Sequence, residues 1–192
     1  MYDEGYRIAR DMGLAALWYL EAAKKGSVQA QAKIGAKYLK GTGVHQDFEK
    51  AFYWLRLAAG EENPDAIAEI GWSFQTGLGA EKNYSKAFSC YERAAKLGHA
   101  ISSYNLAYMY ANGLGTTQDD NNALKWYRHA ADEGNQKAQV NLGLMFINGI
   151  GIEKNDIEAG EWFRKAADLN YAKGEYNLGR MYAEGKGVPN DF

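Results

Sequence analysis

A fixed spacing of glycines constrains this sequence more than any other feature. A segment that begins at Ile34 and reads IGAKYLKGTGVHQD returns in similar form from Ile70, Leu106, Leu142 and Leu178. Its two glycines recur every 36 residues without a gap, at 41, 77, 113, 149 and 185 and at 43, 79, 115, 151 and 187. A period of this size is typical of arrays in which each unit buries its apolar side against its neighbours. We therefore predict one continuous array.

Each repeat predicts two helices joined by short turns. Apolar residues follow helical spacing in the first helix, which we expect over 29–40, 65–76, 101–112, 137–148 and 173–184. The first glycine of each pair is expected to end that helix, because glycine adopts the left-handed conformation without a steric penalty. An Asp or Asn then opens the second helix by accepting from free backbone N–H groups, at Asp11, Asp47, Asn83, Asp119 and Asn155. The predicted fold class is all-α, built from 36-residue helix-turn-helix repeats.

The repeat register extends over the whole chain. We divide residues 1–192 into four full repeats, 27–64, 65–99, 100–135 and 136–171, with a partial repeat at each end. The partial repeat 1–26 contains a second helix, and the partial repeat 172–192 contains a first helix. Arrays of this kind normally end in caps with a polar outer face. Neither end resembles a cap, so we expect a fragment of a longer chain.

Small residues inside the helices predict close packing. Gly35 and Gly143 lie in the middle of first helices, where a glycine costs about 1 kcal/mol relative to alanine. We expect alanine pairs of the second helices, such as Ala58-Ala59, to face them. One column of the second helix supplies large core partners, Trp18, Trp54, Trp126 and Trp162.

One repeat departs from the pattern at the end of its second helix. Gly26, Gly98 and Gly134, with Asn170, are expected to end that helix in the other repeats. Residues 60–64 read GEENP instead, and we expect the proline to replace the glycine as the stop signal.

Composition argues against several partners. The net charge is −2 and the basic residues form no run, so no nucleic-acid footprint is predicted. No apolar stretch reaches the roughly 20 residues that a spanning helix needs, and we predict no direct membrane insertion. Residues 1–26 lack the order of a signal peptide. A single cysteine excludes intrachain disulfides, and the compartment stays undetermined.

No catalytic or metal site is predicted. His45, His99 and His129 occupy unrelated repeat positions, and Cys90 is the only thiol, so convergent ligands or a nucleophile–base pair are absent. We interpret them as surface histidines and a core cysteine. The repeated glycine loops lack the preceding strand of a phosphate-binding loop and are interpreted as turns. We expect a non-enzyme without cofactor or metal.

The motifs resemble the Sel-one-like repeat (SLR) family, relatives of the tetratricopeptide repeat. The segments LGRMYAEGKGVPND from Leu178 and ALKWYRHAADEG from Ala123 carry the resemblance, which covers essentially the whole chain. It implies a right-handed α/α solenoid superhelix with the first helix of each repeat lining the concave face. It also implies an adaptor that assembles protein complexes, as in many bacterial members. Secreted relatives with a disulfide in every repeat differ from this chain.

Variable columns of the first helix are the candidate partner-binding sites. By analogy with tetratricopeptide repeats, two such columns face the groove, and a column of asparagines runs between them. Side-chain amides offer both a donor and an acceptor to an extended peptide, and aromatics add anchors. The competing interpretation is that these side chains only pack between repeats. The candidate residues are Trp72, Tyr104, Asn105, Tyr108, Asn141, Leu144, Tyr176, Asn177 and Arg180.

The functional hypothesis is a non-catalytic scaffold that binds a peptide or helix of a partner protein in the concave groove. The alternative is an envelope protein that binds polysaccharide through groove aromatics, since 14% of the residues are aromatic. A third possibility is self-association through the exposed ends of the array. The identity of the partner is not predicted.

Overall fold

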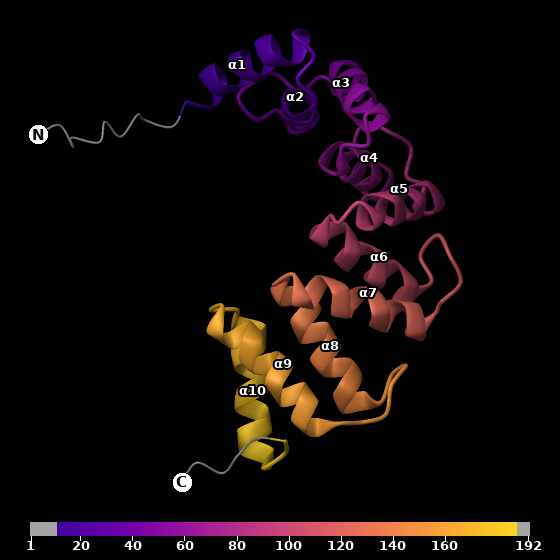
Figure 1. Ribbon diagram of the computed structural model, residues 1–192, viewed down its shortest axis with the longest axis vertical. Coiled ribbons are helices and arrows are strands. Elements are labelled where there is room, and N and C mark those ends of the chain that lie inside the picture. The colour runs from indigo at the N-terminus through magenta and orange to yellow at the C-terminus, as the bar shows by residue number, and fades with distance from the viewer. Residues whose placement is uncertain (1–10, 188–192) are drawn as a thin grey trace, which may run out of the picture.

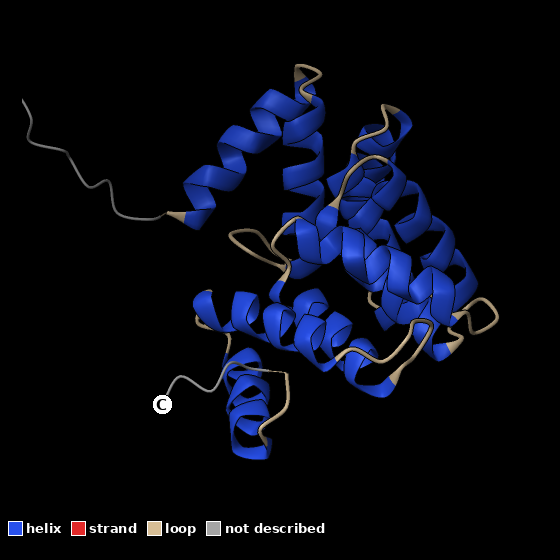
Figure 2. Cartoon of the chain, turned by 60° about the horizontal axis from the view of Figure 1, so that its bottom comes forward, coloured by secondary structure: helices blue, strands red, loops and turns tan. Residues whose placement is uncertain are grey.

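The computed structural model describes residues 11–187, which form helices and turns with no strand in that range (Figure 2). Each helix in the described range has 13 residues. Their bounds are α1 Met12–Lys24, α2 Val28–Lys40, α3 Phe48–Gly60, α4 Pro64–Thr76, α5 Tyr84–Lys96, α6 Ala100–Asn112, α7 Asp120–Asp132, α8 Gln136–Asn148, α9 Asp156–Asp168 and α10 Ala172–Glu184.

The predicted caps open every odd-numbered helix. The side chain of Asp47 accepts from the backbone N–H of Lys50 at 3.0 Å, and the same bond occurs at the other predicted positions, Asp11, Asn83, Asp119 and Asn155. The backbone N–H of Asp47 also donates to the carbonyl of Tyr38 at 3.0 Å. Each cap residue from Asp47 onward thus starts the second helix and ties the loop to the first.

The two glycines of each loop have different structural roles. The first glycine, such as Gly113 with φ +62°, ends the first helix in the left-handed conformation, as predicted. The second glycine packs against the start of the preceding second helix. At Gly151 a Cβ would lie 2.7 Å from the carbonyl oxygen of Asp120, and at Gly115 it would overlap the backbone of Tyr84. The spacing of neighbouring repeats therefore requires the absence of a side chain there.

The prediction that Pro64 ends the third helix was wrong. Glu62 takes the left-handed conformation there, with φ +55°, in the column that Gly26 and Gly98 occupy in other repeats. Pro64 is the first residue of α4, where its fixed φ suits a helix start and its missing N–H is not needed. The turn between α3 and α4 therefore has the same backbone geometry as the equivalent turns, but Glu62 adopts the left-handed conformation at a steric cost that glycine does not have.

Glu62→Gly is expected to stabilise the protein by about 1 kcal/mol, because a non-glycine residue in the left-handed region costs about that much. The exposed Glu62 is 3.9 Å from Arg93, and the loss of so weak a pair subtracts little. Urea unfolding measures the change. Glu61→Gly is the matched control, because Glu61 has φ −90° and should not gain from glycine. Equal effects of both substitutions would contradict the assignment of strain to Glu62.

The helices pack in sequence order into a curved array (Figure 1). Each even-numbered helix from α2 to α8 packs against the helix that follows it, and successive pairs stack. Helix α2 also contacts α4, and α8 contacts α10. In Figure 1, α2 and α4 lie nearer the hollow side of the arc than α3 and α5. These features confirm the predicted all-α solenoid.

Glycine contacts differ from the prediction. A Cβ at Gly35 would lie 2.7 Å from Cγ of Leu55, and one at Gly143 would lie 2.6 Å from Cε1 of Phe163. The glycines therefore face large residues of the second helix and not the alanine pairs. The alanines, such as Ala58 with no exposed surface, are buried in the same core. Close approach was predicted correctly, but its partners were not.

The tryptophan column is buried to different extents along the array, and Trp126 is only partly buried. Trp54 and Trp162 are 9% and 7% exposed, whereas Trp18 of α1 is 68% exposed.

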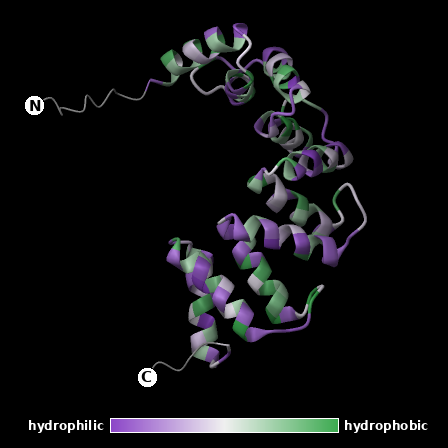
Figure 3. Ribbon diagram, in the orientation of Figure 1, coloured by the Kyte–Doolittle hydropathy of each residue, from purple (hydrophilic) through white to green (hydrophobic). Residues whose placement is uncertain are grey.

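Hydrophobic and hydrophilic residues are mixed along each helix, so no helix is apolar over its whole surface (Figure 3). Among residues 11–187, no helix has the length and apolar character needed to cross a bilayer.

Candidate functional site

The exposed sides of α2, α4, α6, α8 and α10 form one surface, which we call the first-helix face. Most of the predicted site residues line depressions on it. Trp72 and Asn105 lie in one between α2, α4 and α6; Tyr104 shares another with Asn105. Tyr108, Asn141 and Leu144 line a third depression, and Asn177 and Arg180 line a smaller one. Tyr176 is exposed and lies outside these depressions.

The depression beside Trp72, which we call the Trp72 hollow, exists because small residues occupy its floor. Ala32, Ala36 and Ala68 line it, in columns that carry Tyr104 and larger side chains in later repeats. Its volume is about 470 Å³, within the range of small-ligand and side-chain pockets. The rest of its wall is polar or aromatic and consists of Lys33, Lys40, Asp65, Glu69, Trp72, Tyr91, His99, Ile101 and Asn105.

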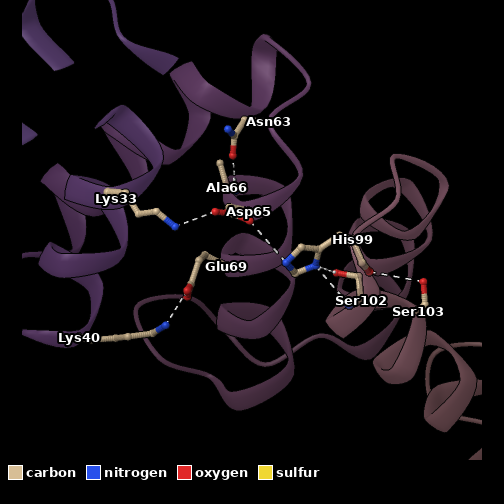
Figure 4. A network of polar contacts seen from close by, with 9 residues as sticks. All are labelled: Lys33, Lys40, Asn63, Asp65, Ala66, Glu69, His99, Ser102 and Ser103. Atoms are coloured by element: carbon tan, nitrogen blue, oxygen red, sulfur yellow. Dashed lines mark hydrogen bonds and ion pairs between the residues drawn. The ribbon is translucent and has the colours of Figure 1, made fainter. Parts of the chain in front are cut away.

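Two ion pairs bridge α2 and α4 along this hollow (Figure 4). Lys33 Nζ lies 2.8 Å from Asp65 Oδ2, and Lys40 Nζ lies 2.5 Å from Glu69 Oε1. The hydrogen bond from Lys33 holds the pKa of Asp65 below its usual value, and the pKa of Lys33 is raised in turn. Both lysines are about half exposed, so each pair contributes about 0–1 kcal/mol and is easily exchanged for another partner.

His99 is not a surface histidine, contrary to the prediction. Its Nδ1 accepts from the backbone N–H of Ser102 at 3.2 Å and caps α6, while its Nε2 lies 3.5 Å from Asp65 Oδ1 (Figure 4). Its column holds cap residues in neighbouring repeats, including Asn63 and Asn135, and this periodicity was the signal that could have identified it. Burial lowers the pKa of His99, against the opposing effect of the Asp65 charge.

His99→Asn is expected to remove a pH dependence of stability. Because the folded pKa lies below the unfolded value of 6.5, the unfolded chain binds more protons. Stability due to neutral His99 is therefore complete above that value and is lost as pH falls through the lowered folded pKa. Asn keeps the cap, as Asn63 and Asn135 show, but does not titrate. Urea unfolding between about pH 8 and pH 5 measures the difference.

His129→Asn is the matched control for this prediction, because His129 lies near the end of α7 and caps no helix start. It controls for the loss of an imidazole that caps no helix start, and the parent and both variants are compared over the same pH range. If His99→Asn and the parent lose stability in parallel as the pH falls, the cap is not titrating in this range.

The asparagine column has three different environments. Asn177 donates to the carbonyl of Lys173 in its own helix at 2.7 Å. Asn141 lies beside Tyr104 and Tyr127; burial raises the pKa of Tyr127, and a hydrogen bond with Asn141 opposes that rise. Asn105 lines the Trp72 hollow and the neighbouring depression. Its amide is therefore the best placed of the three to meet a partner.

A second depression, of about 360 Å³, lies between α6 and α8. Tyr108 is 40% exposed at its rim, and Leu144, Asn141 and the phenol of Tyr127 line it. The buried Met145 also lines it, as do the polar residues Gln118 and Asp120. The face thus carries two depressions about one repeat apart, and the Trp72 hollow has more charged residues in its wall.

No group of three or more metal-ligating side chains occurs within residues 11–187. Burial raises the pKa of the Cys90 thiol and so favours its protonated form. The protonated thiol is a poor nucleophile, because the thiolate is the reactive form.

A family model described as Sel1 repeat matches residues 1–27, 28–62, 64–99, 100–135, 136–171 and 172–192. The chain belongs to the Sel1 repeat family. Sel1 repeat proteins are generally non-catalytic and act as scaffolds that bind protein partners. No curated protein sequence matches the chain.

Three similar solved structures share this fold. A Sel1 repeat protein from Oxalobacter formigenes is 34% identical with a TM-score of 0.87, and the match covers 100% of this chain and 79% of that protein. The c5321 protein of uropathogenic Escherichia coli, described as a protective antigen with an SLR fold, is 31% identical with a TM-score of 0.84. That match covers 94% of this chain but only 39% of the c5321 chain. Cysteine rich protein B of Helicobacter pylori, at 23% identity and a TM-score of 0.55, shares the fold.

Proposed function

We propose that this Sel1 repeat array is a scaffold whose first-helix face binds a peptide or helix of a partner protein. The observation that carries the proposal is the Trp72 hollow, where polar and aromatic side chains surround a floor of alanines. The core columns of the array repeat from unit to unit because packing demands it. The columns at this hollow change from unit to unit, from Ala36 to Trp72 to Tyr108, which packing alone does not require.

The distribution of aromatic anchors supports the same surface. Trp72 and Tyr108 lie in one column on consecutive first helices, each at the wall of a depression. Large aromatic residues of this kind contribute most of the binding energy in many protein interfaces. Arg180 and Tyr176 extend the face onto α10, and both are exposed.

A crosslinking pull-down from lysate of the source organism tests the proposal. The baits are the parent and a variant with Trp72→Ala, Tyr108→Ala and Arg180→Ala, compared after circular dichroism shows equal helicity. A third bait carries Tyr53→Ala, which removes a 58% exposed aromatic from α3. We expect a partner that the parent and Tyr53→Ala capture and the triple variant does not. Capture by all three baits would contradict a role for the first-helix face.

Self-association is a second proposal, and the apolar surface of α1 favours it. Leu14, Leu17 and Trp18 are 50%, 60% and 68% exposed, although Leu14 and Leu17 lie in columns that carry Lys50 and Lys125 elsewhere. We expect this chain to sediment as a concentration-dependent dimer, and Leu17→Lys to shift it to monomer. A parent that stays monomeric at high concentration would exclude the proposal.

A further inference from the structure

We propose that the Trp72 hollow receives a basic side chain, foremost an arginine, from the partner that the first-helix face binds. The inference rests on the proposed function and adds the chemistry of the partner's anchor residue. It is carried by the arrangement of acceptors on α4, by the face of Trp72 and by the size of the hollow.

The acceptors lie on a single side of α4. Asp65, Glu69 and Trp72 are spaced by four and three residues, which places them in line along one helix face. Each carboxylate gives one oxygen to a lysine of α2. The other oxygen of Asp65 faces His99 at 3.5 Å, and Oε2 of Glu69 is shielded from solvent and accepts no hydrogen bond from the described residues. A shielded carboxylate oxygen without a donor is unfavourable, so Glu69 gains from a donor that enters the hollow by displacing Lys40.

The ring of Trp72 already holds a cation. Lys40 Nζ lies 5.2 Å from its centroid, within the range of a cation–π interaction. Because the Lys40 side chain is 41% exposed, its pair with Glu69 is easily opened. A guanidinium can stack flat on an indole ring and donate two parallel hydrogen bonds to a carboxylate. An ammonium also donates to a carboxylate, but as a compact point charge that cannot stack. An arginine of the partner can therefore displace Lys40 from both Trp72 and Glu69.

The floor of the hollow fits the stem of such a side chain. Ala32, Ala36 and Ala68 present only methyl groups, along which the aliphatic part of an arginine can lie. Asn105 on α6 adds an amide oxygen that can accept from the guanidinium. An acidic side chain would have to take Lys33 or Lys40 from Asp65 or Glu69, and it would leave that carboxylate without its donor.

The test selects random linear peptides displayed on phage against the whole chain and measures the affinity of the best peptides by titration calorimetry. We expect enriched peptides to share an arginine or lysine. Substitution of that residue by citrulline or norleucine, which keep the shape without the charge, should weaken binding about tenfold.

Variants of the protein locate the anchor. Ala68→Tyr fills the hollow with the residue that Tyr104 supplies one repeat later, so the array should tolerate it. We expect at least a tenfold loss of affinity for the basic peptides with this variant, and a similar loss with Glu69→Gln. Ser89→Tyr is the matched control, because it adds the same side chain to the exposed side of α5 and copies Tyr53.

The outcomes separate the two proposals. Enriched peptides without a basic residue that still lose affinity with Ala68→Tyr would overturn the basic anchor and leave the binding face in place. Basic peptides that bind Ala68→Tyr and Glu69→Gln as tightly as the parent would place the anchor elsewhere and also overturn it. If no enriched peptide distinguishes Ala68→Tyr from Ser89→Tyr, the basic anchor is overturned. If none distinguishes the parent from the variant with Trp72→Ala, Tyr108→Ala and Arg180→Ala either, the binding face is overturned as well.

Discussion

Gly115→Ala is expected to destabilise the array by about 2–5 kcal/mol. Gly115 has φ +72°, and a side chain in the left-handed region costs about 1–2 kcal/mol. Its Cβ would also lie 2.7 Å from the backbone nitrogen of Ser85, at the start of the preceding second helix. Backbone cannot move aside as a flexible side chain can, so an overpacking cost of about 1–3 kcal/mol adds to the strain. Chemical denaturation monitored by tryptophan fluorescence measures the loss.

Gly98→Ala separates these two contributions. Gly98 has φ +84°, close to that of Gly115, but a Cβ there meets nothing within 4 Å. We expect a loss of only about 1–2 kcal/mol, from the backbone conformation alone. Equal losses at Gly98 and Gly115 would show that the second glycine is needed only for its conformation. The stacking of repeats through that position would then be wrong.

Phe163→Ala is expected to cost about 3–5 kcal/mol, the range for a fully buried phenylalanine. Phe163 has no exposed surface and fills the space that Gly143 leaves on α8. The helices cannot close the resulting cavity easily, because Gly143 offers no side chain to move into it. Unfolding in guanidinium chloride measures the change.

Ile157→Ala on the same helix is the comparison for Phe163→Ala. Ile157 is 65% exposed, and its truncation should change stability by less than about 0.5 kcal/mol. A loss at Phe163 of the same small size would mean that α8 and α9 do not form the closely packed pair described above.

The helix ends were predictable because their signals are local. An Asp or Asn side chain opens each odd-numbered helix, and the first glycine closes each even-numbered one, so the expected range 29–40 differs from Val28–Lys40 by one residue. Glu62 could not be predicted in the same way. No local preference favours glutamate with positive φ, and only its place in the column of Gly26 and Gly98 indicates that conformation.

The site was predictable only in outline. The columns that carry Trp72 and Asn105 could be identified from the period, and both residues line the same hollow. The pairing of Lys33 with Asp65 depends on the stagger between α2 and α4, which no sequence spacing specifies. The cap role of His99 was visible in its column but was missed, because imidazole is an uncommon cap.

Site-specific photo-crosslinking in the source organism tests directly whether the first-helix face binds a partner. A photoreactive phenylalanine analogue replaces either Tyr108 on α6 or Tyr53 on α3, two exposed tyrosines on first and second helices. A partner-binding first-helix face predicts a protein adduct at position 108 and little or none at 53. An adduct at 53 alone, or equal adducts at both positions, would contradict the assignment of this face as the binding surface.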